Sequence, residues 1–252
     1  MRLRTTLAAV TGALALSAVV SPLAHADDHG TTTIDSVVVN GGRPIVIGNS
    51  ETSIPFSLTV SDPAGTDGLT GYVDLWHASP RPLLPSGYLG GDWQNVDCHP
   101  VSASTVTCDG TIPVNPQEDL PRNYLADDWN VAVTAGSTSI TQHSTVAVKR
   151  QARLLSGVVA TTEPGKYKLR GSLLRTDWES GAEQDYSGRT VKLQFRKEGS
   201  TTYSTVDTFT TNDAGRVVAT VQPSEDGYWR WSFGGNQTTG AAKSTELYFD
   251  GV

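Results

Sequence analysis

The sequence predicts an all-β protein made of two tandem antiparallel β-sandwiches that follow a cleaved signal peptide. Three observations support this prediction: a secretory pattern at the N-terminus, apolar and polar residues that alternate with period two, and turn-forming residues at short intervals between the alternating segments. The chain has 252 residues, of which 18% are charged, with 25 Gly and 13 Pro. This length provides for one large domain or two small ones.

Residues 1–26 have the parts of a secretory signal peptide. Two arginines precede an apolar run, and Ala24-His25-Ala26 places small side chains where signal peptidase cleaves. The apolar run is shorter than the roughly 20 residues that a membrane-spanning helix needs. We therefore expect a mature protein that begins at Asp27, is secreted to the extracellular space, and has no membrane span.

The mature chain alternates between apolar and polar residues almost throughout, which indicates half-buried strands of antiparallel sheets. We place the domain boundary at Gln151, so that residues 27–151 and 152–252 are each about the size of one seven-strand sandwich. Linkers between domains carry few contacts, and we expect few contacts across this boundary. The clearest alternating segments are Phe56-Leu58-Val60, Trp129-Val131-Val133, Val191-Leu193-Phe195 and Trp229-Trp231-Phe233.

Charge is distributed unevenly between the two predicted domains. Residues 27–151 contain 14 Asp and Glu against five Lys and Arg, a net charge of −9, whereas residues 152–252 contain twelve of each. The acidic balance argues against sequence-nonspecific binding to nucleic acid, which needs a basic face. Acids in the predicted turns of the first domain could bind calcium, which takes oxygen ligands from loops, or could form a solvated acidic surface. The candidate calcium ligands are Asp62, Asp67, Asp127 and Asp128.

Cys98 and Cys108 are the only two cysteines of a chain that carries an export signal. An oxidising compartment favours a disulfide between them, and the nine residues that they flank suit a hairpin. Closing so short a loop should stabilise the fold by about 2–3 kcal/mol. A metal site formed by both thiolates and His99 is the alternative, although zinc usually takes four protein ligands or three with water.

Four motifs follow one another in the second half of the chain: Tyr186-Ser-Gly-Arg-Thr-Val-Lys-Leu-Gln-Phe-Arg196, Tyr203-Ser-Thr-Val206, Thr211-Asn-Asp-Ala-Gly215 and Asp226-Gly-Tyr-Trp-Arg230. This series resembles the immunoglobulin-like repeats of secreted actinobacterial proteins and covers most of residues 152–252. The first half, with its cysteine hairpin and Asp128-Trp129 strand, resembles such modules more loosely. The resemblance implies two immunoglobulin-like sandwiches in an extracellular setting. It implies no defined activity, so no functional residue follows from it.

The main catalytic signatures are missing, including Gly-x-Ser-x-Gly, His-Glu-x-x-His and the phosphate-binding glycine loops. We therefore expect a non-enzymatic protein that binds an extracellular protein or a glycan. A carbohydrate-binding accessory module, a hydrolase and a spacer without ligand are the alternatives. Trp178, in a polar loop with Tyr186 nearby, is the first candidate for an exposed aromatic that stacks on a sugar, unless it packs on the sandwich edge. Trp93 lies in another loop.

Overall fold

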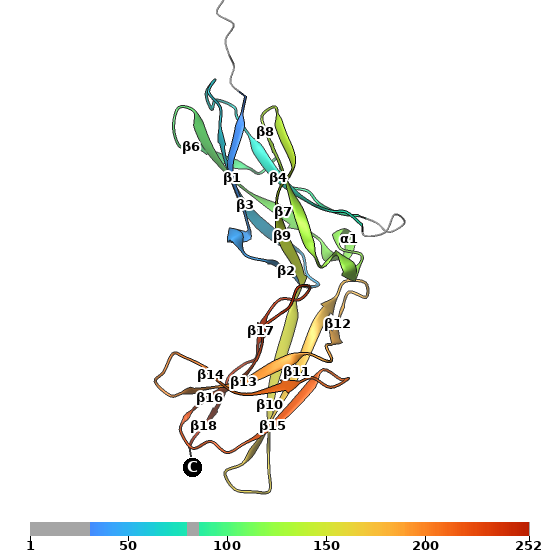
Figure 1. The fold of residues 1–252 in the computed structure, drawn as a ribbon, viewed down its shortest axis with the longest axis vertical. Coiled ribbons are helices and arrows are strands. Elements are labelled where there is room, and N and C mark those ends of the chain that lie inside the picture. Colours follow the sequence, from blue (N-terminus) through green and yellow to red (C-terminus); the bar gives the residue numbers. More distant parts are fainter. Residues whose placement is uncertain (1–30, 80–85, 252) are drawn as a thin grey trace, which may run out of the picture.

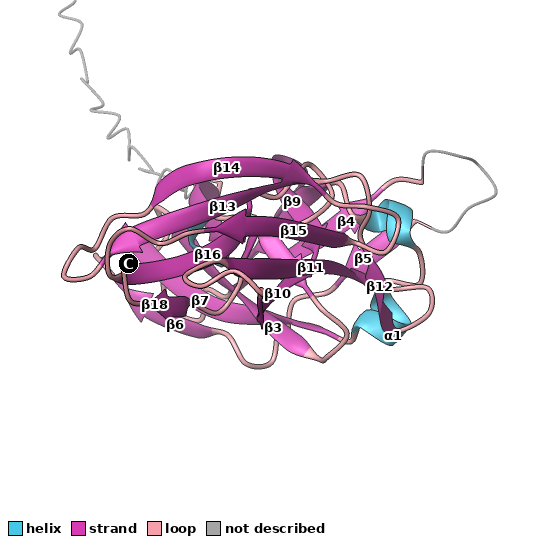
Figure 2. Ribbon diagram, turned by 90° about the horizontal axis from the view of Figure 1, so that it is seen from below, coloured by secondary structure: helices cyan, strands magenta, loops and turns pink. Residues whose placement is uncertain are grey.

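The computed structural model describes residues 31–79 and 86–251. The predicted signal peptide and its cleavage point therefore lie outside the described residues. Within them the chain forms two domains that stack end to end along the long axis of the molecule (Figure 1). Seen from below, the ribbon is almost entirely strand, and the short helix α1 (Pro116–Asp119) lies at its edge (Figure 2). No helix of the described residues is long and apolar enough to cross a membrane.

Two facing sheets form the first domain. The first sheet has the order β1-β3-β7-β6 and the second has the order β2-β9-β8-β4-β5, with β2 parallel to β9 and the other pairs antiparallel. In immunoglobulin nomenclature β1 and β2 correspond to strand A, β3 to B, β4 to C, β5 to C′, β6 to D, β7 to E, β8 to F and β9 to G. The two sheets then have the orders A-B-E-D and A-G-F-C-C′, which is the arrangement of an immunoglobulin domain. The strands are β1 (Thr33–Val39), β2 (Ile45–Ile47), β3 (Thr52–Ser61), β4 (Gly71–His77), β5 (Gly87–Leu89), β6 (Asp97–Pro100), β7 (Thr105–Val114), β8 (Asp128–Ala135) and β9 (Thr138–Arg150).

The second domain has the same kind of architecture. Strand β11 pairs with β10, β12 and β15 in one sheet, while the other sheet has the order β14-β13-β16, with β17 and β18 both paired to β16. All these pairs are antiparallel. With β2 and β9 as the one parallel pair among the named strands of the described residues, the two domains confirm the prediction of two tandem immunoglobulin-like antiparallel β-sandwiches. The strands are β10 (Ala152–Ala160), β11 (Tyr167–Asp177), β12 (Ala182–Asp185), β13 (Thr190–Lys197), β14 (Ser204–Thr210), β15 (Arg216–Val221), β16 (Gly227–Phe233), β17 (Ala242–Lys243) and β18 (Leu247–Phe249).

The period-two pattern places the predicted side chains in two hydrophobic cores. Every second residue of β8, of β16 and of β3 from Ile54 onward is buried, and Trp129 and Trp231 are fully enclosed. One core is drawn from residues 39–148 and the other from residues 152–249. Trp178 is the exception, because it follows β11 of the second domain and yet belongs to the core of the first.

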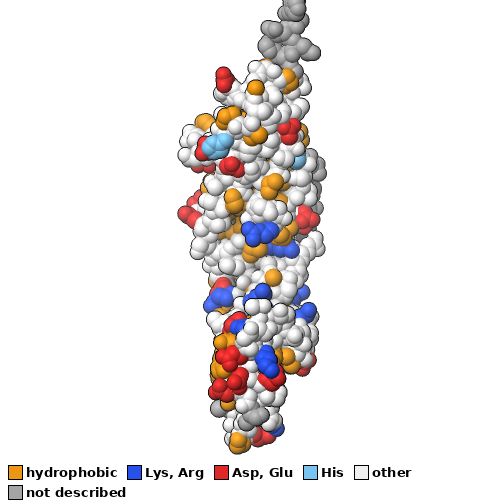
Figure 3. All heavy atoms as spheres, turned by 90° about the vertical axis from the view of Figure 1, so that its left-hand side faces the viewer, with side chains coloured by type: hydrophobic (Ala, Val, Ile, Leu, Met, Phe, Trp, Pro, Cys, Tyr) orange, Lys and Arg blue, Asp and Glu red, His pale blue; other side chains and the backbone are white. Residues whose placement is uncertain are grey.

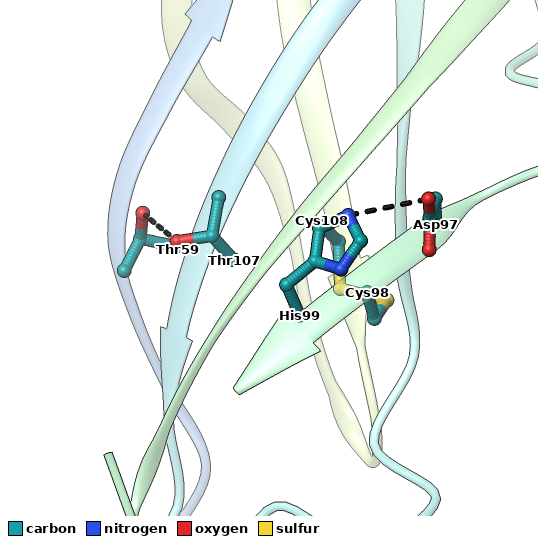
Figure 4. The surroundings of a disulfide bond; sticks show 6 residues. All are labelled: Thr59, Asp97, Cys98, His99, Thr107 and Cys108. Atoms are coloured by element: carbon teal, nitrogen blue, oxygen red, sulfur yellow. Dashed lines mark hydrogen bonds and ion pairs between the residues drawn. A yellow bond between two sulfur atoms is a disulfide. The ribbon is translucent and has the colours of Figure 1, made fainter. Parts of the chain in front are cut away.

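A disulfide joins β6 to β7 in the first domain, as the sequence predicts (Figure 4). Cys98 and Cys108 are directly opposite each other in the antiparallel pair, with Cα atoms 4.0 Å apart. His99 lies beside the bridge, with its Nε2 atom 3.2 Å from an Asp97 oxygen. The two sulfur atoms are bonded to each other, so neither is a thiolate that could bind a metal. The alternative metal site at these cysteines is therefore wrong.

The two domains are connected without a flexible linker, because Gln151 is the only residue between β9 and β10. Its backbone nitrogen donates to the oxygen of Ile47 in the first domain at 2.9 Å, and its backbone oxygen accepts from Thr176 in the second at 2.9 Å. Both peptide groups of this residue are thus held by strands on either side of the boundary.

A loop of the second domain, residues 234–241, packs on the end of the first domain. The Arg150 nitrogen donates to Thr238 oxygen at 3.0 Å, and the Arg150 oxygen accepts from Gly240 nitrogen at 2.9 Å. A Cβ atom at Gly240 would lie 2.8 Å from a methyl group of Val46, so only glycine allows this close approach. The loop therefore extends strand pairing from one domain to the other.

The hairpin of β11 and β12 makes a second contact across the boundary, at the 3-10 turn η2 (Asn123–Leu125). The Asn123 side chain donates to Asp177 Oδ1 at 2.7 Å and accepts from the backbone nitrogen of Trp178 at 3.1 Å. It also accepts from Arg150 at 2.7 Å. The expectation that few contacts cross the boundary is therefore wrong, since the domains form one hydrogen-bonded junction.

Candidate functional site

Trp178 is a structural residue of the junction. Its side chain is 2% exposed and packs in the core of the first domain, and its indole nitrogen donates to the Ile47 oxygen at 3.4 Å. No face of the ring is free to stack on a sugar. The interpretation of Trp178 as an exposed aromatic is wrong, because the neighbouring domain covers the loop that looks polar in the sequence.

Tyr186 is also enclosed, at 4% exposure, in the core of the second domain. The guanidinium carbons of Arg175 and Arg189 lie 4.0 and 4.5 Å from its ring centre, and Asn236 donates to its hydroxyl at 2.7 Å. Burial would raise the pKa of this phenol, but hydrogen bonds from Thr239 and Asn236 and the two arginines lower it instead. Tyr186 therefore has no open ring face for a sugar either.

The four acids proposed as calcium ligands lie at opposite ends of the first domain. Asp62 follows β3 and accepts a hydrogen bond from the Thr32 hydroxyl at 2.7 Å. It lies at the end of the domain where β8 finishes at Ala135. Asp127 precedes β8, and Gln237 of the second domain lies 3.5 Å from its carboxylate. A strand of this length separates the two ends by roughly 25 Å.

Asp67 shares the turn of Asp62, and Asp128 is adjacent to Asp127, so the four carboxylates do not converge on one ion. Among residues 31–79 and 86–251, no three His, Cys, Asp or Glu side chains are grouped so as to hold a metal ion. The four candidate calcium ligands therefore do not form one site, and the acids of this domain are spread over its surface.

The two most exposed aromatic side chains lie on the edge of the first domain. Tyr88, in the short edge strand β5, is 61% exposed, and Trp93, in the loop that leads to β6, is 67% exposed. Tyr88 is paired with Trp76 of β4, which places both side chains on the outer face of the sheet. Burial against the sheet and the carboxylate of Asp74, which accepts a hydrogen bond from Tyr88, raise the pKa of the phenol.

The loop that carries Trp93 is held in place by its own polar groups. The backbone nitrogen of Gly91 donates to Asp74 at 2.9 Å, and that of Asp92 donates to Thr111 oxygen of β7 at 3.0 Å. The Asp92 carboxylate accepts in turn from Asn95 at 2.6 Å. The indole of Trp93 is thus presented to solvent by an ordered turn.

Tyr88 forms one wall of a groove of about 720 Å³ between β5, the start of β3 and α1. Three carboxylates line it, and two of them are held by Asn115, which donates from its backbone to Asp119 at 2.7 Å and from its side chain to Glu51 at 3.4 Å. Such a groove combines an aromatic surface with fixed hydrogen-bond acceptors. It is lined by Glu51, Thr52, Ser53, Tyr88, Gly90, Pro113, Val114, Asn115, Glu118 and Asp119.

Trp93 was visible in the sequence as a loop aromatic, whereas Tyr88 was missed. Tyr88 lies between two buried residues, Gly87 and Leu89, but a run of three residues is too short to predict an edge strand from the sequence. On the side of the molecule shown in Figure 3, hydrophobic side chains are scattered rather than joined in one patch, and Lys and Arg gather around the middle. Tyr88 is the exposed aromatic residue that lines the groove between β5, β3 and α1.

No protein-family model and no curated protein matches the sequence. Among solved structures, the Yersinia pseudotuberculosis adhesin InvE aligns at 12% identity and a TM-score of 0.27, over 86% of this chain and 58% of that protein. The D0-D1 domain of intimin aligns at 10% identity and 0.27, over 87% and 100% of the two chains. Bovine butyrophilin aligns at 9% identity and 0.29, over 84% and 98%. These TM-scores are too low to assign a fold or a function. The strand order by itself defines the protein as one with immunoglobulin-like domains.

Proposed function

We propose that this protein is a secreted, non-enzymatic binding protein whose first domain holds a glycan in the groove beside Tyr88. The observation that carries the proposal is the pair of highly exposed aromatics, Tyr88 and Trp93, five residues apart along one edge of the domain. The disulfide and the predicted signal peptide support an extracellular setting.

The chemistry of the groove suits a sugar. The flat ring of an exposed Tyr or Trp stacks on the apolar face of a pyranose, since both surfaces lose contact with water. Carboxylates and amides at the rim, such as Glu51, Glu118 and Asn115, accept or donate hydrogen bonds to hydroxyl groups. The first domain carries a net charge of −9, so it favours an uncharged or amino sugar over an acidic one.

Binding of the mature protein, residues 27–252, to a panel of cellulose, chitin, chitosan and xylan tests the proposal. Tyr88→Ala and Trp93→Ala should each weaken binding about tenfold or more, the equivalent of about 1.4 kcal/mol. Tyr248→Ala is the matched control, because Tyr248 is an exposed tyrosine of the second domain. Wild-type affinity in both first-domain variants, or binding to no polysaccharide of the panel, would overturn the proposal.

A further inference from the structure

The second domain carries a different surface feature, a groove of about 660 Å³ on the outer face of its β14-β13-β16-β17 sheet. Three cations line it, Arg196, Arg230 and Lys243, together with the single carboxylate of Glu246. These four groups have a net charge of +2 in a chain whose total charge is −7. The local sign is therefore opposite to that of the whole protein and of the groove in the first domain.

Glu246 is already engaged by two neighbours. It pairs with Arg196 at 3.2 Å and accepts a hydrogen bond from the Tyr203 hydroxyl at 2.5 Å. The hydrogen bond from Tyr203, followed by that from Arg196, keeps the pKa of Glu246 below its ordinary value. The carboxylate thus stays ionised and pairs directly with Arg196, and its charge also acts on Arg230. Because one carboxylate faces three cations, the groove keeps its net positive charge.

Arg230 is held in a fixed orientation. Its guanidinium carbon lies 3.5 Å from the centre of the Tyr203 ring, and its Nε donates to Gln194 Oε1 on the neighbouring strand at 2.9 Å. Within residues 31–79 and 86–251, no carboxylate pairs with Arg230 or with the exposed Lys243. A planar guanidinium whose orientation is already set loses little freedom when it takes up an anion.

We propose that this groove is a second binding site, which takes an acidic saccharide. A carboxylate or sulfate group of the sugar lies against Arg230 and Lys243, where charge complementarity favours it. The remaining lining includes Ser200, Thr201 and Thr202, whose hydroxyls can exchange hydrogen bonds with a sugar ring. This site is independent of the glycan groove in the first domain, because it lies in the other domain and selects the opposite charge.

Calorimetric titration of the mature protein tests the site with four probes: oligogalacturonate, a heparin oligosaccharide, an uncharged malto-oligosaccharide of the same length, and inorganic phosphate. We expect at least one acidic oligosaccharide to bind, and the first two probes distinguish a carboxylate from a sulfate. Arg230→Ala and Lys243→Ala should each weaken this binding tenfold or more. Lys168→Ala removes the same charge from an exposed position on the opposite sheet and should leave the affinity unchanged.

Arg230→Lys keeps the charge but loses the planar fork, and we expect at least a threefold loss in a variant whose melting temperature shows an intact fold. Equal affinity for the uncharged oligosaccharide, equal losses in Lys168→Ala, or phosphate binding as tight as that of the saccharide would overturn the proposal. Tyr88→Ala should leave acidic-saccharide binding intact, so that failure of this site and failure of the first-domain site are separate results.

Discussion

The junction makes one strong prediction, because Trp178 of the second domain completes the core of the first. Burying a tryptophan side chain removes about 150–250 Å² from water, worth roughly 4–6 kcal/mol at about 25 cal/mol per Å². Measured Trp→Ala changes in cores cost about 3–5 kcal/mol. Trp178→Ala should therefore remove about 3–5 kcal/mol from the free energy of unfolding, a large share of the 5–15 kcal/mol typical of a domain.

Urea unfolding followed by far-UV circular dichroism measures this loss. Trp93→Ala is the matched control, because the same side chain is deleted at a position that is 67% exposed, and its effect should stay within about 0.5 kcal/mol. Calorimetry should also show the transition of the first domain at a lower temperature in Trp178→Ala. An isolated fragment of residues 27–151 lacks the tryptophan and should show a similar deficit.

Two results would refute this reasoning about the junction. The first is an unfolding midpoint in Trp178→Ala that equals that of Trp93→Ala. The second is a fragment of residues 27–151 that is as stable alone as the first domain is within the whole protein. Either result would mean that the buried indole contributes nothing to the first domain.

Four further predictions concern separate features. Asn123→Ala should cost about 1.5–3 kcal/mol in urea unfolding, because a buried guanidinium loses its acceptor. Replacing Cys98 and Cys108 by Ser should cost about 2–3 kcal/mol by the same assay. Calcium and sodium chloride at matched ionic strength should give equal melting temperatures, because the acids do not converge. For a heparin probe, affinity should stay constant from pH 7 to 5 and rise below pH 4, as Glu246, whose pKa its bond from Tyr203 depresses, becomes neutral.

Strand positions and core residues could be predicted from the sequence because they depend on local alternation. Val131 and Val133 of β8 are buried on either side of an outward-facing Ala132, as a half-buried strand requires. Trp129 follows the same pattern, and its indole nitrogen donates to the oxygen of Leu125 at 2.7 Å. The disulfide could be predicted because it joins neighbours in one hairpin.

The candidate site could not be predicted in the same way, because burial of a loop residue depends on what packs over it. Asp177-Trp178-Glu179 is polar around its tryptophan, and nothing in this local pattern shows that another domain will cover the ring. Tyr186 is enclosed by two arginines of its own domain, which a hydropathy pattern counts as polar. Tyr88 lies in a strand of three residues, too short for alternation to be recognised.

Because Gln151 is the single residue between β9 and β10, the two grooves would bind one polysaccharide at a fixed separation. A flexible linker would let each domain sample many separations, so the second binding event would benefit from an effective concentration averaged over all of them. Here the junction fixes both the distance and the rotation between the two grooves. A polysaccharide that carries neutral and acidic sugars would therefore bind both grooves at once only when these sugars are separated by the distance that the junction sets. The protein would then discriminate between polysaccharides by the spacing of their acidic sugars.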